Sequence, residues 1–85
     1  MLRSAVRESL PSDFDREGAM AFLAARAVPA LERVTPHVYS RSLRVAGRAV
    51  SLSCHFDGGT LVARSVPALP HGVLREHVRR LFDLG

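Results

Sequence analysis

The clearest pattern along the chain is an alternation of apolar and polar positions over residues 49–56. Every second residue there is apolar: Val50, Leu52, Cys54 and Phe56. The residues between them are small or polar: Ala49, Ser51, Ser53 and His55. A period of two residues is typical of a strand that buries one face and exposes the other. The pattern therefore predicts a half-buried antiparallel strand.

Two neighbouring segments extend this strand into a meander. Residues 37–45 and 60–66 are enriched in β-branched, aromatic and aliphatic side chains, which favour strands. Between the first two strands, Ala46-Gly47 is short enough to form a two-residue hairpin loop. Between the last two, Asp57-Gly58-Gly59 supplies the positive φ angles that a hairpin needs. The sequence therefore predicts three consecutive antiparallel strands.

The segment before the meander predicts an amphipathic helix over residues 14–27. Apolar residues recur there at helical spacing: Met20, Leu23, Ala24 and Ala27. Phe22 widens this stripe, and with Leu23 it is expected to fill the core. Candidate N-caps with oxygen-bearing side chains lie at Ser12, Asp13 and Asp15. Pro29 disfavours helical geometry at Val28 and ends the helix.

A second amphipathic helix is predicted from Pro70 to about Asp83, with Phe82 beside a stripe of Leu74, Val78 and Leu81. A weakly alternating segment at residues 3–10, ended by Pro11, predicts a short edge strand. The element order is then β-α-β-β-β-α. The simplest architecture is an α+β fold in which both helices cover one face of an antiparallel sheet of about four strands. The opposite face carries Ser51, Ser53 and His55 and is left uncovered.

Length and composition describe an ordinary small globular domain. The chain has 85 residues and 9.3 kDa, of which 47% are hydrophobic and 24% charged. It is predicted to be a single domain over residues 1–85 with a core of about 3–84. No apolar run approaches the ~20 residues that span a bilayer, and charges interrupt any signal sequence at the N-terminus. The single cysteine, Cys54, fits a reducing compartment, so a cytoplasmic protein without membrane contact is expected.

The charge is carried in an unusual way, because all twelve basic residues are arginine against eight acidic residues, for a net charge of +4. Positive charge favours polyanions such as nucleic acid, although a lysine-free chain is also typical of a GC-rich gene. The one basic cluster comprises Arg75, Arg79 and Arg80. Glu76 is placed to pair with Arg80, and no aromatic residue is interleaved for base stacking. We expect these arginines to make weak DNA contacts or domain-interface contacts, or to form a solvated face.

Catalytic and metal chemistry leave no signature in the sequence. No serine lies in a nucleophile elbow, and the histidines at positions 37, 55, 71 and 77 never recur at a spacing of four. The Asp57-Gly58-Gly59 segment lacks a phosphate-binding motif and is explained by a hairpin turn. Cys54 alternates with apolar residues and is expected to pack as a small hydrophobe. The sequence therefore predicts no catalytic residue, cofactor or metal site.

Several segments resemble one known family when they are taken together. They are Phe14-Asp15, residues 20–29 (MAFLAARAVP), Glu32, residues 38–45 (VYSRSLRV) and residues 79–84 (RRLFDL). Over residues 11–84 the chain is similar to the N-terminal domain of AlkA-type DNA-3-methyladenine glycosylase II. The resemblance implies a TATA-binding-protein-like topology of one sheet and two helices.

The function that this resemblance implies is base excision repair of alkylated DNA, in which a damaged base is flipped out and its glycosidic bond is hydrolysed. In the family, the catalytic aspartate and the DNA-gripping helix-hairpin-helix belong to the domains that follow this one. The chain is therefore expected to be inactive alone, to act as a scaffold for catalytic domains in cis, and to reach DNA through them. The alternative is a stand-alone interaction module, or a homo-oligomer, that uses the uncovered sheet face.

Structural roles are expected for the polar residues in the matching segments. Arg26 and Arg41 are predicted to make hydrogen bonds or ion pairs, with Glu32 or Asp83 as candidate partners. Three alanines on the first helix are expected to allow a close approach to the sheet: Ala24, Ala25 and Ala27. A domain cut from a larger chain is also expected to show an apolar patch near the second helix, with Phe82 and Leu84 partly exposed.

Overall fold

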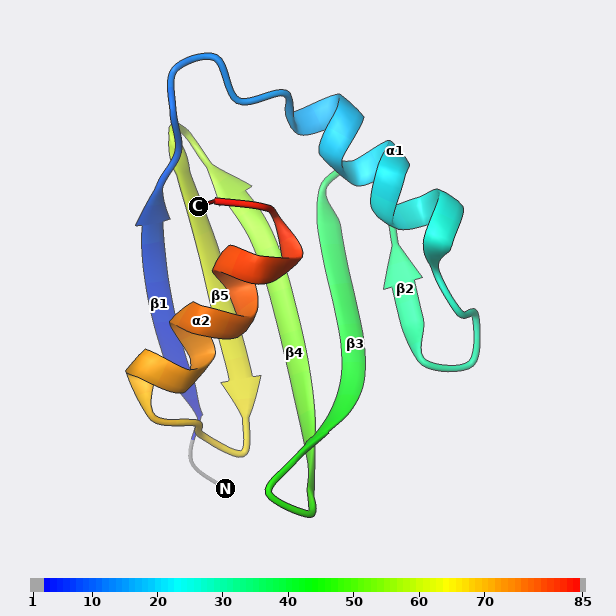
Figure 1. The fold of residues 1–85 in the computed structure, drawn as a ribbon, viewed down its shortest axis with the longest axis vertical. Helices are drawn as coiled ribbons and strands as arrows, with labels where there is room; N and C mark the ends of the chain where they lie inside the picture. Colours follow the sequence, from blue (N-terminus) through cyan, green and yellow to red (C-terminus); the bar gives the residue numbers. More distant parts are fainter. Residues whose placement is uncertain (1–2, 85) are drawn as a thin grey trace.

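The computed structural model describes residues 3–84 as one antiparallel sheet with two helices (Figure 1). The elements in chain order are β1 (Ser4–Ser9), α1 (Arg16–Arg26), β2 (Glu32–Val34), β3 (Val38–Val45), β4 (Arg48–Asp57), β5 (Thr60–Val66) and α2 (His71–Leu81). The strands lie side by side in the order β1-β5-β4-β3-β2. The predicted α+β class is confirmed.

The meander forms as the alternating pattern predicts. Strand β3 pairs with β4 up to Val45 opposite Arg48, which leaves Ala46-Gly47 as the two-residue loop. Both loop residues have positive φ, 51° and 79°, as the tight hairpin requires. Strand β4 pairs with β5 up to Asp57 opposite Thr60, and Gly58 has a φ of 58° in that turn.

The sheet has five strands rather than about four, because residues 32–34 form the additional edge strand β2. Arg33 pairs with Ser40 on β3, and Val34 pairs with Tyr39. The turn between the strands is closed by Thr35, whose hydroxyl accepts a hydrogen bond from the backbone N–H of Val38 at 3.0 Å. Three residues are too few to show a period of two, so the sequence pattern does not reveal this strand.

Helix α2 closes the core over β1 and β5. Leu74 and Val78 are fully buried, and Phe82 is only 5% exposed. The Phe82 ring meets the rings of Tyr39 and Phe56 edge-on, with centroids 6.5 and 6.0 Å apart. The expectation of a partly exposed Phe82 is therefore wrong, because the two aromatic rings and the end of α2 enclose it. The same expectation is confirmed for Leu84, which packs against the core and stays partly exposed.

Helix α1 covers much less of the sheet. It starts after Asp15, whose carboxylate accepts a hydrogen bond from the N–H of Gly18 at 2.9 Å, so this candidate N-cap is the one used. Met20 and Leu23 are buried, but Ala24 is exposed and Phe22 is 57% exposed. The expectation that Phe22 and Ala24 belong to the buried stripe is wrong, because α1 lies beside the β2 edge rather than over the sheet centre (Figure 1).

Candidate functional site

The face of the sheet opposite the helices carries a polar band. Cross-strand pairing aligns one row of side chains over four strands: Arg33, Ser40, Ser53 and Arg64. The next row places Ser42 beside Ser51. We call these six residues the serine–arginine band. Because side chains alternate between faces along a strand, all six point away from the buried core on the other side.

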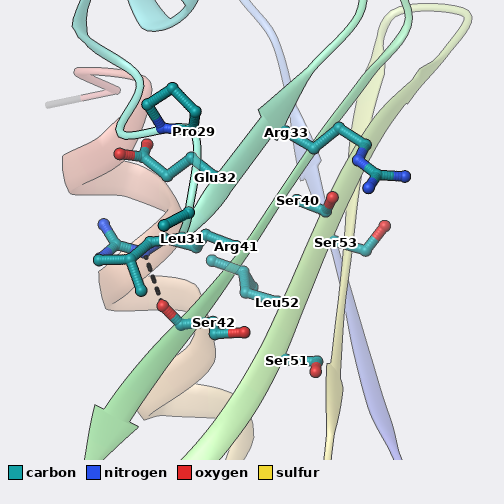
Figure 2. Close-up of a pocket in the computed structure, with 11 residues that line it drawn as sticks. Pro29, Leu31, Glu32, Arg33, Ser40, Arg41, Ser42, Ser51, Leu52 and Ser53 are labelled. Atoms are coloured by element: carbon teal, nitrogen blue, oxygen red, sulfur yellow. Dashed lines mark hydrogen bonds between the residues drawn. The ribbon is translucent and has the colours of Figure 1, made fainter.

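Figure 2 shows the part of this band that lies over β2, β3 and β4. The side chains of Arg33, Ser40 and Ser53 extend to one side of the strands, opposite α2. A shallow hollow of about 290 Å³ lies here, bordered by the loop before β2. Serine hydroxyls donate and accept hydrogen bonds, and guanidinium groups bind phosphate or carboxylate in a fork. The hollow therefore offers the chemistry of an anion site.

Charge is distributed unequally between the two faces. By strand alternation the open face carries four arginines, at positions 7, 33, 44 and 64, and one acidic residue, Asp57. The other seven acidic residues lie on helices, in loops or on helix-facing strand positions. Asp57 is itself paired with Arg7 at 2.9 Å, and this arginine holds the pKa of the carboxyl below its usual value. Within residues 3–84, neither Arg33 nor Arg64 has an ionic or hydrogen-bond partner.

The three arginines of the basic cluster on α2 form ion pairs with carboxylates of this chain. The Glu8 side chain on β1 lies 2.7 Å from Arg75 and 3.0 Å from Arg79. Arg80 pairs with Glu76, as their spacing predicts. Glu8 is only 8% exposed, so these contacts fasten α2 to the β1 edge of the sheet. Arg75, Arg79 and Arg80 thus have internal partners that the serine–arginine band lacks.

A second polar group joins β2 to β3 on the helix side. The hydroxyl of Tyr39 donates to the carboxylate of Glu32 at 2.5 Å, and this bond lowers the pKa of Glu32. Burial, with the Glu32 bond as a lesser cause, raises the pKa of Tyr39 to about 12. The charges of Arg41 and Arg26 add to the lowering of the Glu32 pKa, and a hydrogen bond or ion pair of either arginine with Glu32 stays a prediction. Asp83, the other predicted partner, instead adopts a left-handed backbone with φ 54° at the end of α2.

Cys54 and the histidines belong to no metal-ligand group in the described part of the chain. The Cys54 side chain is fully buried, and burial raises the pKa of its thiol to about 12, so it packs as a small hydrophobe as expected. Among residues 3–84, no three His, Cys, Asp or Glu side chains are grouped so that they could hold a metal ion. In the same range neither helix is long and apolar enough to cross a membrane.

Exposed apolar side chains gather near α1 rather than near α2. Phe22 is 57% exposed, and Val28 and Leu31 in the following loop are each 49% exposed. The guanidinium of Arg26 stacks on the Phe22 ring, 4.9 Å from its centroid. A mostly apolar groove of about 350 Å³ runs between this helix and the turn after β2. This region, together with Phe22, Val28 and Leu31, forms what we call the α1 apolar surface.

A family model described as the AlkA N-terminal domain matches residues 6–85. The chain belongs to this family. The match covers nearly the whole sequence and includes both helices, strands β2 to β5 and the greater part of β1. No curated protein sequence matches the chain. The family is named for a domain of a DNA repair glycosylase.

The residues that carry the resemblance to the AlkA N-terminal domain lie at structural junctions. Residues 20–29 form α1 and the start of the loop that feeds β2. Tyr39 and Arg41 place the family's strand segment against Glu32. Residues 79–84 form the C-terminal end of α2, where two backbone hydrogen bonds close the last turn. The N–H of Leu84 donates to the carbonyl of Arg79, and the N–H of Asp83 donates to the carbonyl of Arg80.

Sequence reasoning found part of the serine–arginine band and missed the rest. Ser51 and Ser53 are recognised because β4 alternates strictly. Ser40 and Ser42 lie on one face of β3, but Arg41 between them breaks the alternation, and Arg64 stands between Ala63 and the polar Ser65 in β5. No strict alternation therefore marks these three residues as part of one band. Arg33 could not be found in this way, because β2 is too short to show a period.

Proposed function

We propose that this chain is the non-catalytic N-terminal domain of an AlkA-type DNA-3-methyladenine glycosylase, and that it serves as a scaffold for the catalytic helical domains. Membership of the AlkA N-terminal domain family supports the proposal. Three of the four aspartates already have structural tasks: Asp15 caps α1, Asp57 pairs with Arg7, and Asp83 ends α2. The chain alone therefore has no glycosylase activity.

The observation that carries the scaffold role is the α1 apolar surface. Large exposed apolar areas mark protein interaction sites in soluble domains. Phe22 is an aromatic side chain on a rigid helix, which suits an anchor at an interface. The catalytic domains would dock here, bury Phe22, and complete the covering of α1.

Two measurements on the 85-residue chain test this proposal. Release of 3-methyladenine from methylated DNA is expected to stay at the level of a no-protein control. Binding to the separately purified helical domains of an AlkA-type glycosylase, followed by calorimetry, is expected to weaken at least tenfold in Phe22→Ser. The control Val73→Ser, at an exposed apolar position of α2, keeps the wild-type affinity. Base release by the chain, or equal losses in both variants, would overturn the proposal.

The second candidate function is an independent interaction module that uses the open sheet face. The openness of that face favours it, but two copies meeting there would bring arginines of like charge together. We therefore favour the scaffold role and expect a monomer in light scattering up to high protein concentration. A dimer that persists in Phe22→Ser and dissociates in Ser53→Arg, which adds a further positive charge to the open face, would favour the module instead.

A further inference from the structure

We propose that the serine–arginine band binds the sugar–phosphate backbone of nucleic acid directly. This inference goes beyond the scaffold role, in which contact with DNA is left to the catalytic domains. It rests on the arrangement of cations and hydroxyls on the open sheet face.

The geometry of the band suits an extended anion. Arg33 and Arg64 stand at the two ends of a row that crosses β2, β3, β4 and β5. Adjacent strands are ~4.8 Å apart, so the row is roughly 14 Å long, or about four base-pair steps along a duplex. Between the arginines, Ser40 and Ser53 present short hydroxyl side chains that donate to phosphate oxygens. The sugar–phosphate backbone can therefore approach the serines in the middle of the row closely, while the guanidinium groups of Arg33 and Arg64 bind phosphates at its two ends.

The electrostatics of the face also point to a polyanion. Arg33 and Arg64 are exposed and have no partner among residues 3–84, whereas the arginines of α2 are paired with Glu8 and Glu76. Among residues 3–84, Asp57 is the only acidic residue at a strand position of the open face, and it is paired with Arg7. The carboxylate of Glu32, which also borders the hollow, accepts a hydrogen bond from Tyr39. No free carboxylate on this face therefore competes with phosphate for the two arginines.

The serine–arginine band contains no aromatic side chain, and this favours duplex over single-stranded nucleic acid as its ligand. Within residues 3–84, the five aromatic residues lie on α1, at the C-cap of α2, in the loop before α1, or on helix-facing strand positions: Phe14, Phe22, Tyr39, Phe56 and Phe82. Bases of a single strand would find no stacking platform on the band. A duplex has the higher density of phosphate charge, so it is the better ligand, and binding is independent of sequence.

The test uses fluorescence anisotropy with a fluorescein-labelled duplex DNA of mixed sequence over a series of NaCl concentrations. The affinity of the 85-residue chain is expected to fall with salt, and each free arginine of the band contributes about 0.9 to the slope of log K against log salt. Arg33→Ser and Arg64→Ser should each weaken binding about threefold to tenfold at low salt and flatten the slope by about one. Arg48→Ser is the matched control, because it removes another exposed arginine that has no ion pair within residues 3–84 and lies at the β3–β4 hairpin end, off the band.

Three outcomes would overturn the proposal. The first is an equal loss in Arg48→Ser, which would mean that only net charge matters. The second is tighter binding of a single strand than of the duplex. The third is displacement of the duplex by an acidic peptide at equal charge concentration, which would assign the band to a protein partner. Circular dichroism of each variant checks that the fold is retained.

The proposal stands or falls separately from the scaffold role. Phe22→Ser is expected to bind the duplex like the wild type, because Phe22 lies on α1 and does not line the hollow at the band. Arg33→Ser and Arg64→Ser are expected to bind the helical domains like the wild type. If any of these three variants lost both duplex binding and binding to the helical domains, the two surfaces would not be separate.

Discussion

The two helices have the same length but different relations to the core. Helix α2 buries Leu74 and Val78 completely and is tied to β1 through Glu8. Helix α1 buries Met20 and Leu23 but leaves Phe22 exposed. The contrast shows that α2 completes the core of this chain, whereas α1 keeps exposed apolar surface that another molecule could bury.

The largest expected effect on this contrast comes from truncating a core residue of each helix. Leu74→Ala should lower the free energy of unfolding by about 3–4 kcal/mol, because it leaves a cavity at a fully buried site. Leu23→Ala should cost only ~2 kcal/mol, because its site lies beside the hollow between α1 and α2, where water can replace the lost side chain. Urea unfolding measures both. Equal costs would mean that α1 is as firmly seated as α2.

A smaller effect is expected from the ion pairs that hold α2. Glu8→Gln should lower the free energy of unfolding by about 1–2 kcal/mol, because Arg75 and Arg79 lose the carboxylate between them. This loss of unfolding free energy is smaller than the loss expected for a fully buried ion pair, because both arginine side chains are half exposed. Glu76→Gln is the control, since its pair with Arg80 is exposed and should contribute under ~0.5 kcal/mol. A cost for Glu8→Gln no larger than the control would show that apolar packing alone seats α2.

The smallest effect concerns the bond that joins β2, beneath α1, to the rest of the sheet. Tyr39→Phe removes the hydrogen bond to Glu32 and should cost ~1 kcal/mol. In the wild type, the pKa of Tyr39 is raised from 10.0 to about 12, so folding favours the neutral phenol. This contribution is complete below pH 10 and is lost as the pH rises from 10 to 12.

The measurement is direct because Tyr39 is the only tyrosine and the chain has no tryptophan. Ultraviolet absorbance of the phenolate should show a midpoint near pH 12 in the folded protein and near 10 in denaturant. The free energy of unfolding of Tyr39→Phe should not show the decline between pH 10 and 12 that is expected for the wild type. A folded-state midpoint near 10 would show that Tyr39 is accessible and that β2 is held loosely.

Much of the fold follows from short-range pattern. The alternation over residues 49–56, the turn at Ala46-Gly47 and the stripe of α2 each predict the element that the structure contains. These signals are local, because period and turn conformation depend on neighbouring residues. The family resemblance, too, depends on residues in the sequence and is confirmed.

The sequence alone determined the order of the main elements, the apolar side of each and the family. Only the tertiary structure decided that residues 32–34 add a fifth strand, that Phe82 is enclosed while Phe22 is exposed, and that Arg33 and Arg64 share a row. The physical reason is that a periodic pattern marks which side of an element is apolar. It does not determine where along the sheet that element packs, nor how much of its apolar side is covered.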